Sequence, residues 1–217
     1  MTVATGTPHF VWYLMRGSGL VSLVLLSITV ALGVIGAQRW KSSRWPRLVT
    51  AGLHRNLSLL AVCFLGIHIV TATVDSFIGL SWIGVIVPFT SGYRPLWVGL
   101  GVLAFDLLAA VTATSLLRAR IGFHAWRLIH WCTWLLWPLA VSHALGSGTD
   151  VFSAWGLAIT GGCVGLVAVA AAWRLWPVRR PSTRVPVARA GSTPPLPRTT
   201  RPTTRLVMPL GGHRDTH

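Results

Sequence analysis

Four of the eight histidines in the chain lie in two apolar blocks, and their type and spacing could do chemistry. They are His54 and His68 in one block, and His130 and His143 in another. Ionisable side chains at membrane depth are costly and usually mark function. A neutral imidazole nitrogen is a good iron ligand, and two imidazoles on facing helices can fill both axial positions. Iron saturated in this way transfers electrons rather than binding oxygen directly.

The spacing of these histidines predicts two levels across a bilayer. Separations of 14 and 13 residues place the two histidines of each block about 20 Å apart along a helix. With both blocks running in the same direction, each level receives one imidazole per helix, as two stacked b-type haems require. Any one histidine could instead be a hydrogen-bonded packing residue. Zinc is the competing metal, but it would need a Cys, an Asp or a third His close by, and the sequence offers none at either level.

Five apolar blocks near 20 residues long must position the histidines. A helix of this length crosses the roughly 30 Å hydrocarbon core. We therefore predict an all-α, polytopic membrane helix bundle with five transmembrane helices, over residues 14–37, 50–73, 95–117, 125–146 and 155–176. Three cysteines fall inside these blocks without the spacing of a zinc or iron–sulfur site. We expect them to be small core residues: Cys63, Cys132 and Cys163.

The charges between the blocks predict the orientation of the bundle. Basic residues gather in two loops and the carboxyl-terminal tail: Arg39, Lys41, Arg44, Arg47, Arg118, Arg120 and the arginines after residue 176. The other two loops carry Asp75 with Arg94, and Asp150. Cytoplasmic loops carry the excess of Lys and Arg, so we expect the amino terminus outside and the carboxyl terminus inside.

Composition supports membrane insertion and argues against nucleic acid. The chain is 53% hydrophobic, with four acidic residues and a net charge of +15, but the charge is concentrated in loops and in residues 177–217 rather than on one face. That tail holds eight Pro and eight Arg, which predicts a disordered cytoplasmic segment. Attraction to anionic lipid is its simplest role, and docking of a soluble partner is the alternative. Arg outnumbers Lys 18 to 1, a hint of a bacterial plasma membrane.

The stretch from Asp75 to Pro95 is apolar in its middle but too short to cross a membrane, and Pro88, Gly92 and Pro95 interrupt it. We expect an interfacial or re-entrant segment on the outer face. It could be a loop packed over the bundle, or it could cover a cofactor.

The fourth block poses a geometric problem. On an ideal helix, 14 residues return His68 to within about 40° of His54, but 13 residues leave His143 about 140° from His130. Pro138 lies between the last two histidines and removes a backbone hydrogen bond. The sequence therefore predicts a kink or local rewinding there.

Three arginines lie where they could pair with haem propionates. Arg55 adjoins His54 and Arg127 precedes His130, both toward the expected inner face, whereas Arg94 lies toward the outer face. The alternative is that all three are ordinary snorkelling or topology charges.

At these residues the chain resembles the ferric-reductase-like transmembrane domain superfamily. The family includes ferric reductases, NADPH oxidases and the membrane subunit of periplasmic methionine sulfoxide reductase. The resemblance rests on H(x13)H at His54 and His68 and on H(x12)H at His130 and His143, and it covers about residues 14–176. WRLIHWCTWLLWPLAVSHALGSGTD, which begins at Trp126, looks like the second haem helix of the family, and YRPLWVGLGVLAFDLL looks like entry into the intervening helix.

The resemblance implies a haem-binding membrane domain over residues 1–176 and a role as an oxidoreductase membrane subunit. His54 with His130 would hold the inner haem and His68 with His143 the outer one, as metal ligands. Electrons would pass outward from a cytoplasmic flavoprotein carrying FMN or FAD, or from quinol. The acceptor would be a ferric chelate, a partner reductase or oxygen. Many relatives continue into a flavin and nicotinamide domain, whereas this chain shows no Gly-rich phosphate fingerprint.

Two other hypotheses about the function of the chain stay open. The chain could be a quinol-fed subunit of a periplasmic reductase, in which a flavin replaces or joins one haem, or a non-redox haem-handling or structural membrane protein. In none of them does a side chain need to act as acid, base or nucleophile.

Overall fold

A computed structural model describes residues 9–37, 47–76, 78–149 and 151–175, and within these ranges the chain is helical without strands. The five predicted transmembrane helices are confirmed, since five helices are long and apolar enough to cross a membrane. They are α1 (His9–Ala37), α2 (Arg47–Val74), α4 (Pro95–Leu116), α6 (Phe123–Trp131) continued by α7 (Thr133–Ser147), and α8 (Ala154–Leu175). Two short helices, α3 (Trp82–Ile86) and α5 (Arg118–Ile121), lie in the connections.

Helices are the natural structure for these blocks because lipid offers no partners for backbone N–H and C=O groups. A helix satisfies these groups within its own segment. α4 begins at Pro95, whose missing N–H and fixed φ suit a first helical position. α1 begins at His9, five residues before the predicted start at residue 14, so only the edges of the predicted spans shift.

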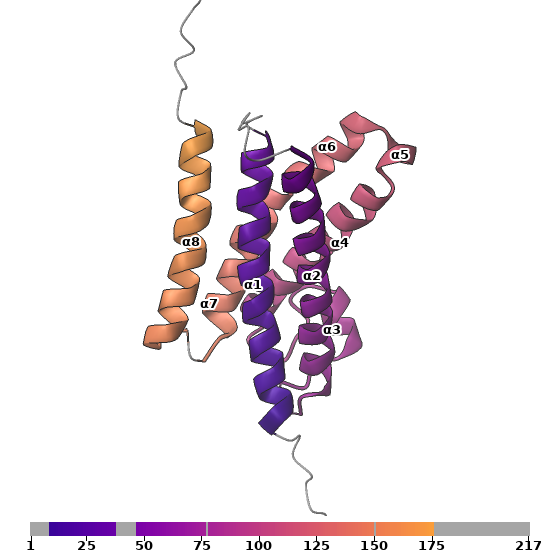
Figure 1. Ribbon diagram of the computed structural model, residues 1–217. Helices are drawn as coiled ribbons and strands as arrows, with labels where there is room; N and C mark the ends of the chain where they lie inside the picture. The colour runs from indigo at the N-terminus through magenta and orange to yellow at the C-terminus, as the bar shows by residue number, and fades with distance from the viewer. Residues whose placement is uncertain (1–8, 38–46, 77, 150, 176–217) are drawn as a thin grey trace, which may run out of the picture. The chain divides into compact units, whose positions relative to one another are not determined.

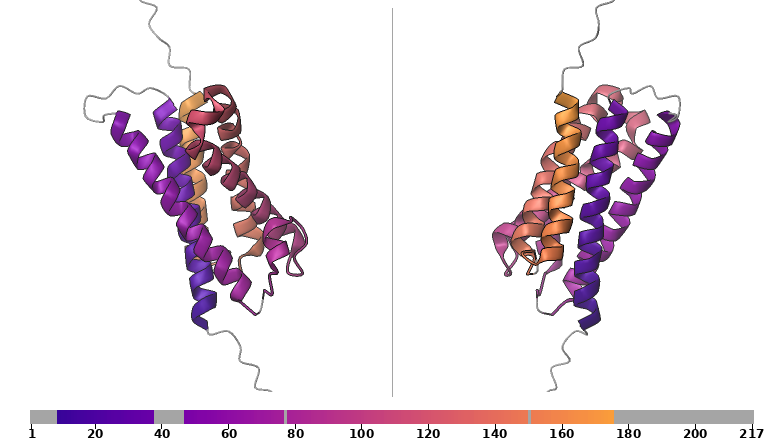
Figure 2. Two further views of the ribbon diagram at one scale, coloured as in Figure 1. Left: turned by 90° about the vertical axis from the view of Figure 1, so that its right-hand side faces the viewer. Right: turned by 60° about the vertical axis from the view of Figure 1, so that its left-hand side comes forward.

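α1 is the central helix of the bundle. It packs against α2, α7 and α8, while α4 packs against α7, and Figure 1 shows α1 between α2 and α8. Figure 2 shows α2 inclined to α1 along its length. Small polar side chains on the buried side of α1 allow this close approach: Ser18, Ser22, Ser27 and Thr29.

The contact between α1 and α7 combines apolar packing with a hydrogen bond. Leu23 of α1, Val141 of α7 and Cys163 of α8 form a buried cluster. Next to it, Nε1 of Trp137 donates to Oγ of Ser27 at 3.0 Å. Cys163 is therefore a core residue as expected, but Cys63 is exposed on the surface of α2. The expectation for Cys63 was wrong because lipid tolerates a cysteine as well as a core does.

The fourth span is interrupted between its two histidines, as predicted. The interruption lies at Cys132, between α6 and α7, whereas Pro138 sits inside the continuous helix α7. N–H of Cys132 donates to the carbonyl of Ile129 at 3.0 Å, an i to i+3 bond that tightens the turn. Because the span departs from a regular α-helix at this turn, the angle between His130 and His143 need not be that of an ideal helix.

The segment between α2 and α4 folds over one end of the bundle. Asp75 is 2% exposed, while Trp82, Ile83 and Ile86 of α3 are each more than 60% exposed. Ser81 caps α3 by accepting from the backbone N–H of Gly84. Its outward apolar side chains fit the predicted interfacial segment.

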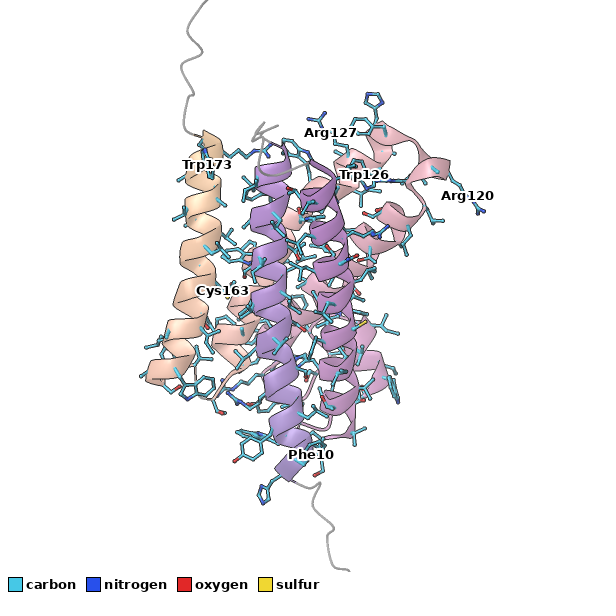
Figure 3. The ribbon with its side chains drawn as sticks, in the orientation of Figure 1. Phe10, Arg120, Trp126, Arg127, Cys163 and Trp173 are labelled. Atoms are coloured by element: carbon cyan, nitrogen blue, oxygen red, sulfur yellow. The ribbon has the colours of Figure 1, made fainter. Side chains whose placement is uncertain are left out.

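Several sequence expectations fall outside the described residues. These are the basic loop residues Arg39, Lys41 and Arg44, Asp150, and the tail over residues 177–217. The amino-terminus-out orientation also stays a prediction. Figure 3 shows Arg120, Arg127 and Trp173 toward one end of the bundle, and Phe10 at the other.

A candidate cofactor site built from two histidine pairs

The four intramembrane histidines meet in two pairs, each joining α2 to the fourth span. The ring centroids of His54 and His130 are 6.2 Å apart with the planes tilted by 59°. Those of His68 and His143 are also 6.2 Å apart, with the planes at 78°. α2 and the fourth span therefore run in the same direction, and each contributes one imidazole to each pair.

Except at the two histidine pairs, α2 and the fourth span pack on other helices rather than on each other. Among the described helices, α2 packs mainly on α1, and α7 mainly on α4. The paired rings therefore reach toward each other across a space that the backbones leave open. A flat group could enter such a space between the two helices.

Three of the four imidazoles are oriented by backbone carbonyls of neighbouring helices. Nδ1 of His54 lies 3.0 Å from the carbonyl oxygen of Thr29, and Nδ1 of His68 lies 2.7 Å from that of Met15. Nδ1 of His143 lies 2.9 Å from the carbonyl oxygen of Trp97.

These contacts assign the tautomer of each ring. A carbonyl oxygen can only accept, so each Nδ1 carries the proton and donates it. Nε2 of a neutral ring then keeps its lone pair. This is the form in which imidazole binds a metal, with the other nitrogen hydrogen-bonded to a carbonyl.

His130 is held differently. Its Nδ1 is buried and has no hydrogen-bond partner among the described residues. Its ring instead stacks on Trp126, with centroids 5.1 Å apart and planes 28° apart. Trp126 is fixed in turn because its Nε1 donates to Oγ of Ser115 at 3.2 Å.

A cavity of about 250 Å³ surrounds the pair formed by His68 and His143. Its walls come from α1, α2, α4, α7 and α8 and are mostly apolar, with Leu23, Leu65 and Phe105 among them. Arg16 of α1 also lines the cavity, so a guanidinium lies beside a mostly apolar space. A pocket with apolar walls and few polar groups is typical of a cofactor site.

The segment between α2 and α4 forms part of the cavity wall. Ile78, Leu80 and Val85 contribute apolar side chains, and Tyr93 contributes a phenol. Phe89 packs over the amino-terminal turn of α4, where its ring fills the space beside Gly99. This segment therefore lines part of the cavity, and a role in covering a cofactor stays a prediction.

The predicted arginines occupy different surroundings. Arg55 and Arg127 are exposed, on the helices that carry His54 and His130 respectively. Arg94 precedes α4 with φ of 40°, and its guanidinium donates to the carbonyl of Gly146. Arg94 thus ties the start of α4 to the end of α7. Pairing of these arginines with propionates stays a prediction.

Sequence reasoning missed Arg16, which lies inside the first apolar block and so escaped the survey of the loops. An arginine at that depth was itself a signal, because charged residues inside spans usually face the interior of a bundle. Arg16 also donates to Oγ1 of Thr149 and lies over the ring of Trp12. It is a further candidate partner for an anionic group in the cavity.

The donor set at each level is two imidazoles. Within residues 9–37, 47–76, 78–149 and 151–175, no three of His, Cys, Asp and Glu come close enough to hold a metal ion. A tetrahedral zinc site needs four such ligands, or three with water. Two opposed imidazoles instead suit a metal whose other positions are filled by a macrocycle.

Comparison with known proteins identifies one family. The family described as "Ferric reductase like transmembrane component" matches residues 18–141, more than half of the chain. The matched range includes His54, His68 and His130 and ends two residues before His143. No curated protein and no solved structure matches the chain.

Proposed function

Because this chain belongs to the ferric reductase like transmembrane component family, we propose that it is a multi-pass membrane module that carries electrons through two b-type haems. His54 and His130 hold one haem, and His68 and His143 hold the other. The family assignment supports a membrane redox role. The ligand assignment is our inference from the two histidine pairs.

The observation that carries the proposal is the separation of the paired rings. Metal–imidazole bonds are about 2 Å long, so imidazoles on opposite sides of one ion hold their ring centres about 6 Å apart. Both pairs have centroids 6.2 Å apart. For His54, His68 and His143 the nitrogen left for the ion is Nε2, because Nδ1 is engaged with a backbone carbonyl.

Direct packing of two imidazoles is the competing explanation, since aromatic rings also pair at roughly 4.5–7 Å. It explains one pair but not the whole arrangement. Two pairs with equal spacing, on two helices that otherwise stand apart, serve a packing role poorly. Packing also gives no reason to hold three rings in the tautomer that leaves Nε2 free.

The surrounding residues can bind and insulate such a group. When bound, haem supplies one-electron iron chemistry, and the protein supplies ligands, orientation and a dry environment. Arg16 in the cavity could neutralise a propionate beside His68 and His143. Arg94 is the second candidate there, and Arg55 and Arg127 are the candidates for the other pair.

The direction of electron flow follows from the predicted orientation. The pair of His54 and His130 would face the cytoplasm and receive electrons from a flavoprotein with FMN or FAD, or from quinol. The pair of His68 and His143 would deliver them to a ferric chelate, a partner reductase or oxygen outside a bacterial plasma membrane. The chain is then the membrane subunit of an oxidoreductase.

Haem stoichiometry on the purified full chain tests the proposal. We expect two haems per wild-type chain, and one in each of His68→Ala and His130→Ala, because each substitution removes a ligand from a different pair. His124→Ala is the matched control. His124 is exposed on α6 and contacts Phe123, so this variant should keep both haems.

Difference spectra of the two variants should show different remaining low-spin signals. A colourless wild-type protein from cells supplied with haem would contradict the proposal. So would loss of both signals in His124→Ala, since the histidine pairs would then not be the specific cause.

A further inference from the structure

The carbonyls that orient three histidines share a feature in the sequence. The Nδ1–H of His68 donates to the backbone carbonyl of Met15, that of His54 to the carbonyl of Thr29, and that of His143 to the carbonyl of Trp97. In each case the residue four positions after the accepting carbonyl is a glycine: Gly19, Gly33 and Gly101.

A glycine at this position has a physical consequence for the carbonyl. In a helix the carbonyl of residue i accepts from the N–H of residue i+4, which uses one of its two lone pairs. The Cα–Cβ bond of residue i+4 tilts toward the amino terminus and covers that carbonyl from the side. Without the Cβ, a second donor can reach the remaining lone pair.

The imidazoles occupy the space that a Cβ would fill. A Cβ on Gly101 would lie 2.5 Å from Nδ1 of His143. One on Gly19 would lie 2.8 Å from Nδ1 of His68. One on Gly33 would lie 3.4 Å from Cε1 of His54, which is tight but not prohibitive.

The spacing along α1 matches the spacing along α2. Gly19 and Gly33 are 14 residues apart, as are His54 and His68. Because α1 and α2 are antiparallel neighbours, equal spacing lets each histidine meet its own glycine. The same step along α4 leads from Gly101 to Ser115. There a serine stands in place of glycine, and His130 is the histidine whose Nδ1 has no hydrogen-bond partner within the part of the chain that the structure describes.

We infer that Gly19, Gly33 and Gly101 are positioning residues that open a helix carbonyl to the Nδ1–H of a haem ligand. This inference rests on the proposed function. The carbonyl contact fixes the ring and raises the basicity of Nε2, which favours ferric iron. A Cβ at these positions displaces the ring and weakens that contact.

Redox titration of the haem-loaded full chain, followed by the spectra of the two haems, tests the inference. Gly19→Ala and Gly101→Ala lie on different helices but act on the same pair, His68 with His143. Both should move the midpoint potential of the same haem to a more positive value. Gly33→Ala should move the other one, by less, because its Cβ contact is the longest.

Gly17→Ala is the matched control. Gly17 lies on α1 two residues before Gly19, and a Cβ there meets nothing within 4 Å, so both potentials should stay unchanged. If Gly101→Ala fails to accumulate, Gly19→Ala still tests the same haem.

Equal shifts of both haems in every variant would overturn the inference, because they would indicate general loosening. Unchanged potentials in Gly19→Ala and Gly33→Ala would overturn it too. In either case a wild-type chain with two haems would leave the proposed function standing, whereas a wild type without haem would overturn both.

Discussion

Trp126 is the residue on which the orientation of His130 depends. The indole stacks on the imidazole at 5.1 Å and is anchored by its hydrogen bond to Ser115. An aromatic pair contributes roughly 0.5–1.5 kcal/mol beyond burial, and a hydrogen bond about 1 kcal/mol. Since His130 has no partner on Nδ1, this stack is its main restraint among the described residues.

Trp126→Leu should therefore weaken haem binding at the pair of His54 and His130. A loss of about 1.4 kcal/mol corresponds to tenfold in affinity, and we expect a loss of about that size, measured by titrating haem into the apoprotein. The other pair should bind unchanged. Trp82→Leu is the control, because Trp82 is 68% exposed on α3. Equal weakening at both pairs would mean that Trp126 only supports the bundle.

The sequence showed which residues could be ligands but not what holds them. The four histidines and their spacing were visible because polar residues inside apolar blocks are rare. The Nδ1 partners were not visible, since Met15, Thr29 and Trp97 contribute only backbone carbonyls. Any residue type supplies a carbonyl, so in the sequence only the glycines four positions later distinguish these carbonyls from others.

Among the elements, the interruption at Cys132 solves the problem that the fourth span posed. An ideal helix would separate His130 and His143 by about 140°. α6 ends and α7 begins at a tightened turn around Cys132. With this turn, His130 of α6 and His143 of α7 can both point at α2. The need for an irregularity could be predicted from helix geometry, whereas its place at Cys132 could not, because that depends on which turn tightens.

Pro138→Ala should consequently keep both haems. Pro138 is exposed and lies inside α7, six residues after Cys132, so we expect alanine to restore a backbone N–H without moving the turn at Cys132. The thermal midpoint should stay or rise, because proline inside a helix costs up to about 3 kcal/mol in soluble hosts. Haem content and a thermal melt measure this. Loss of the haem held by His68 and His143 would show that Pro138, not the turn at Cys132, aligns the span.

At the scale of the whole molecule, the two histidine pairs would be the ends of the proposed electron route. The pairs are separated by 14 residues along α2, or about 20 Å along its axis. Arg120 of α5 and Arg127 of α6 lie toward the same end of the bundle as Trp173 of α8 (Figure 3). The number of spans could be predicted because length and hydropathy determine it. The side that faces the cytoplasm needs an experiment, because it is set during insertion.

Thiol labelling in intact cells and in inverted vesicles tests the orientation. The native residues Cys63, Cys132 and Cys163 are first replaced by alanine, and then Thr90→Cys or Arg120→Cys is introduced. Both positions are exposed, one in the segment that covers the cavity and one in α5. Because cytoplasmic loops retain Lys and Arg, a membrane-impermeant reagent should label Thr90→Cys in intact cells and Arg120→Cys only in inverted vesicles. The reverse pattern would put the pair of His68 and His143 on the cytoplasmic side, and electrons would then have to enter beside Arg16.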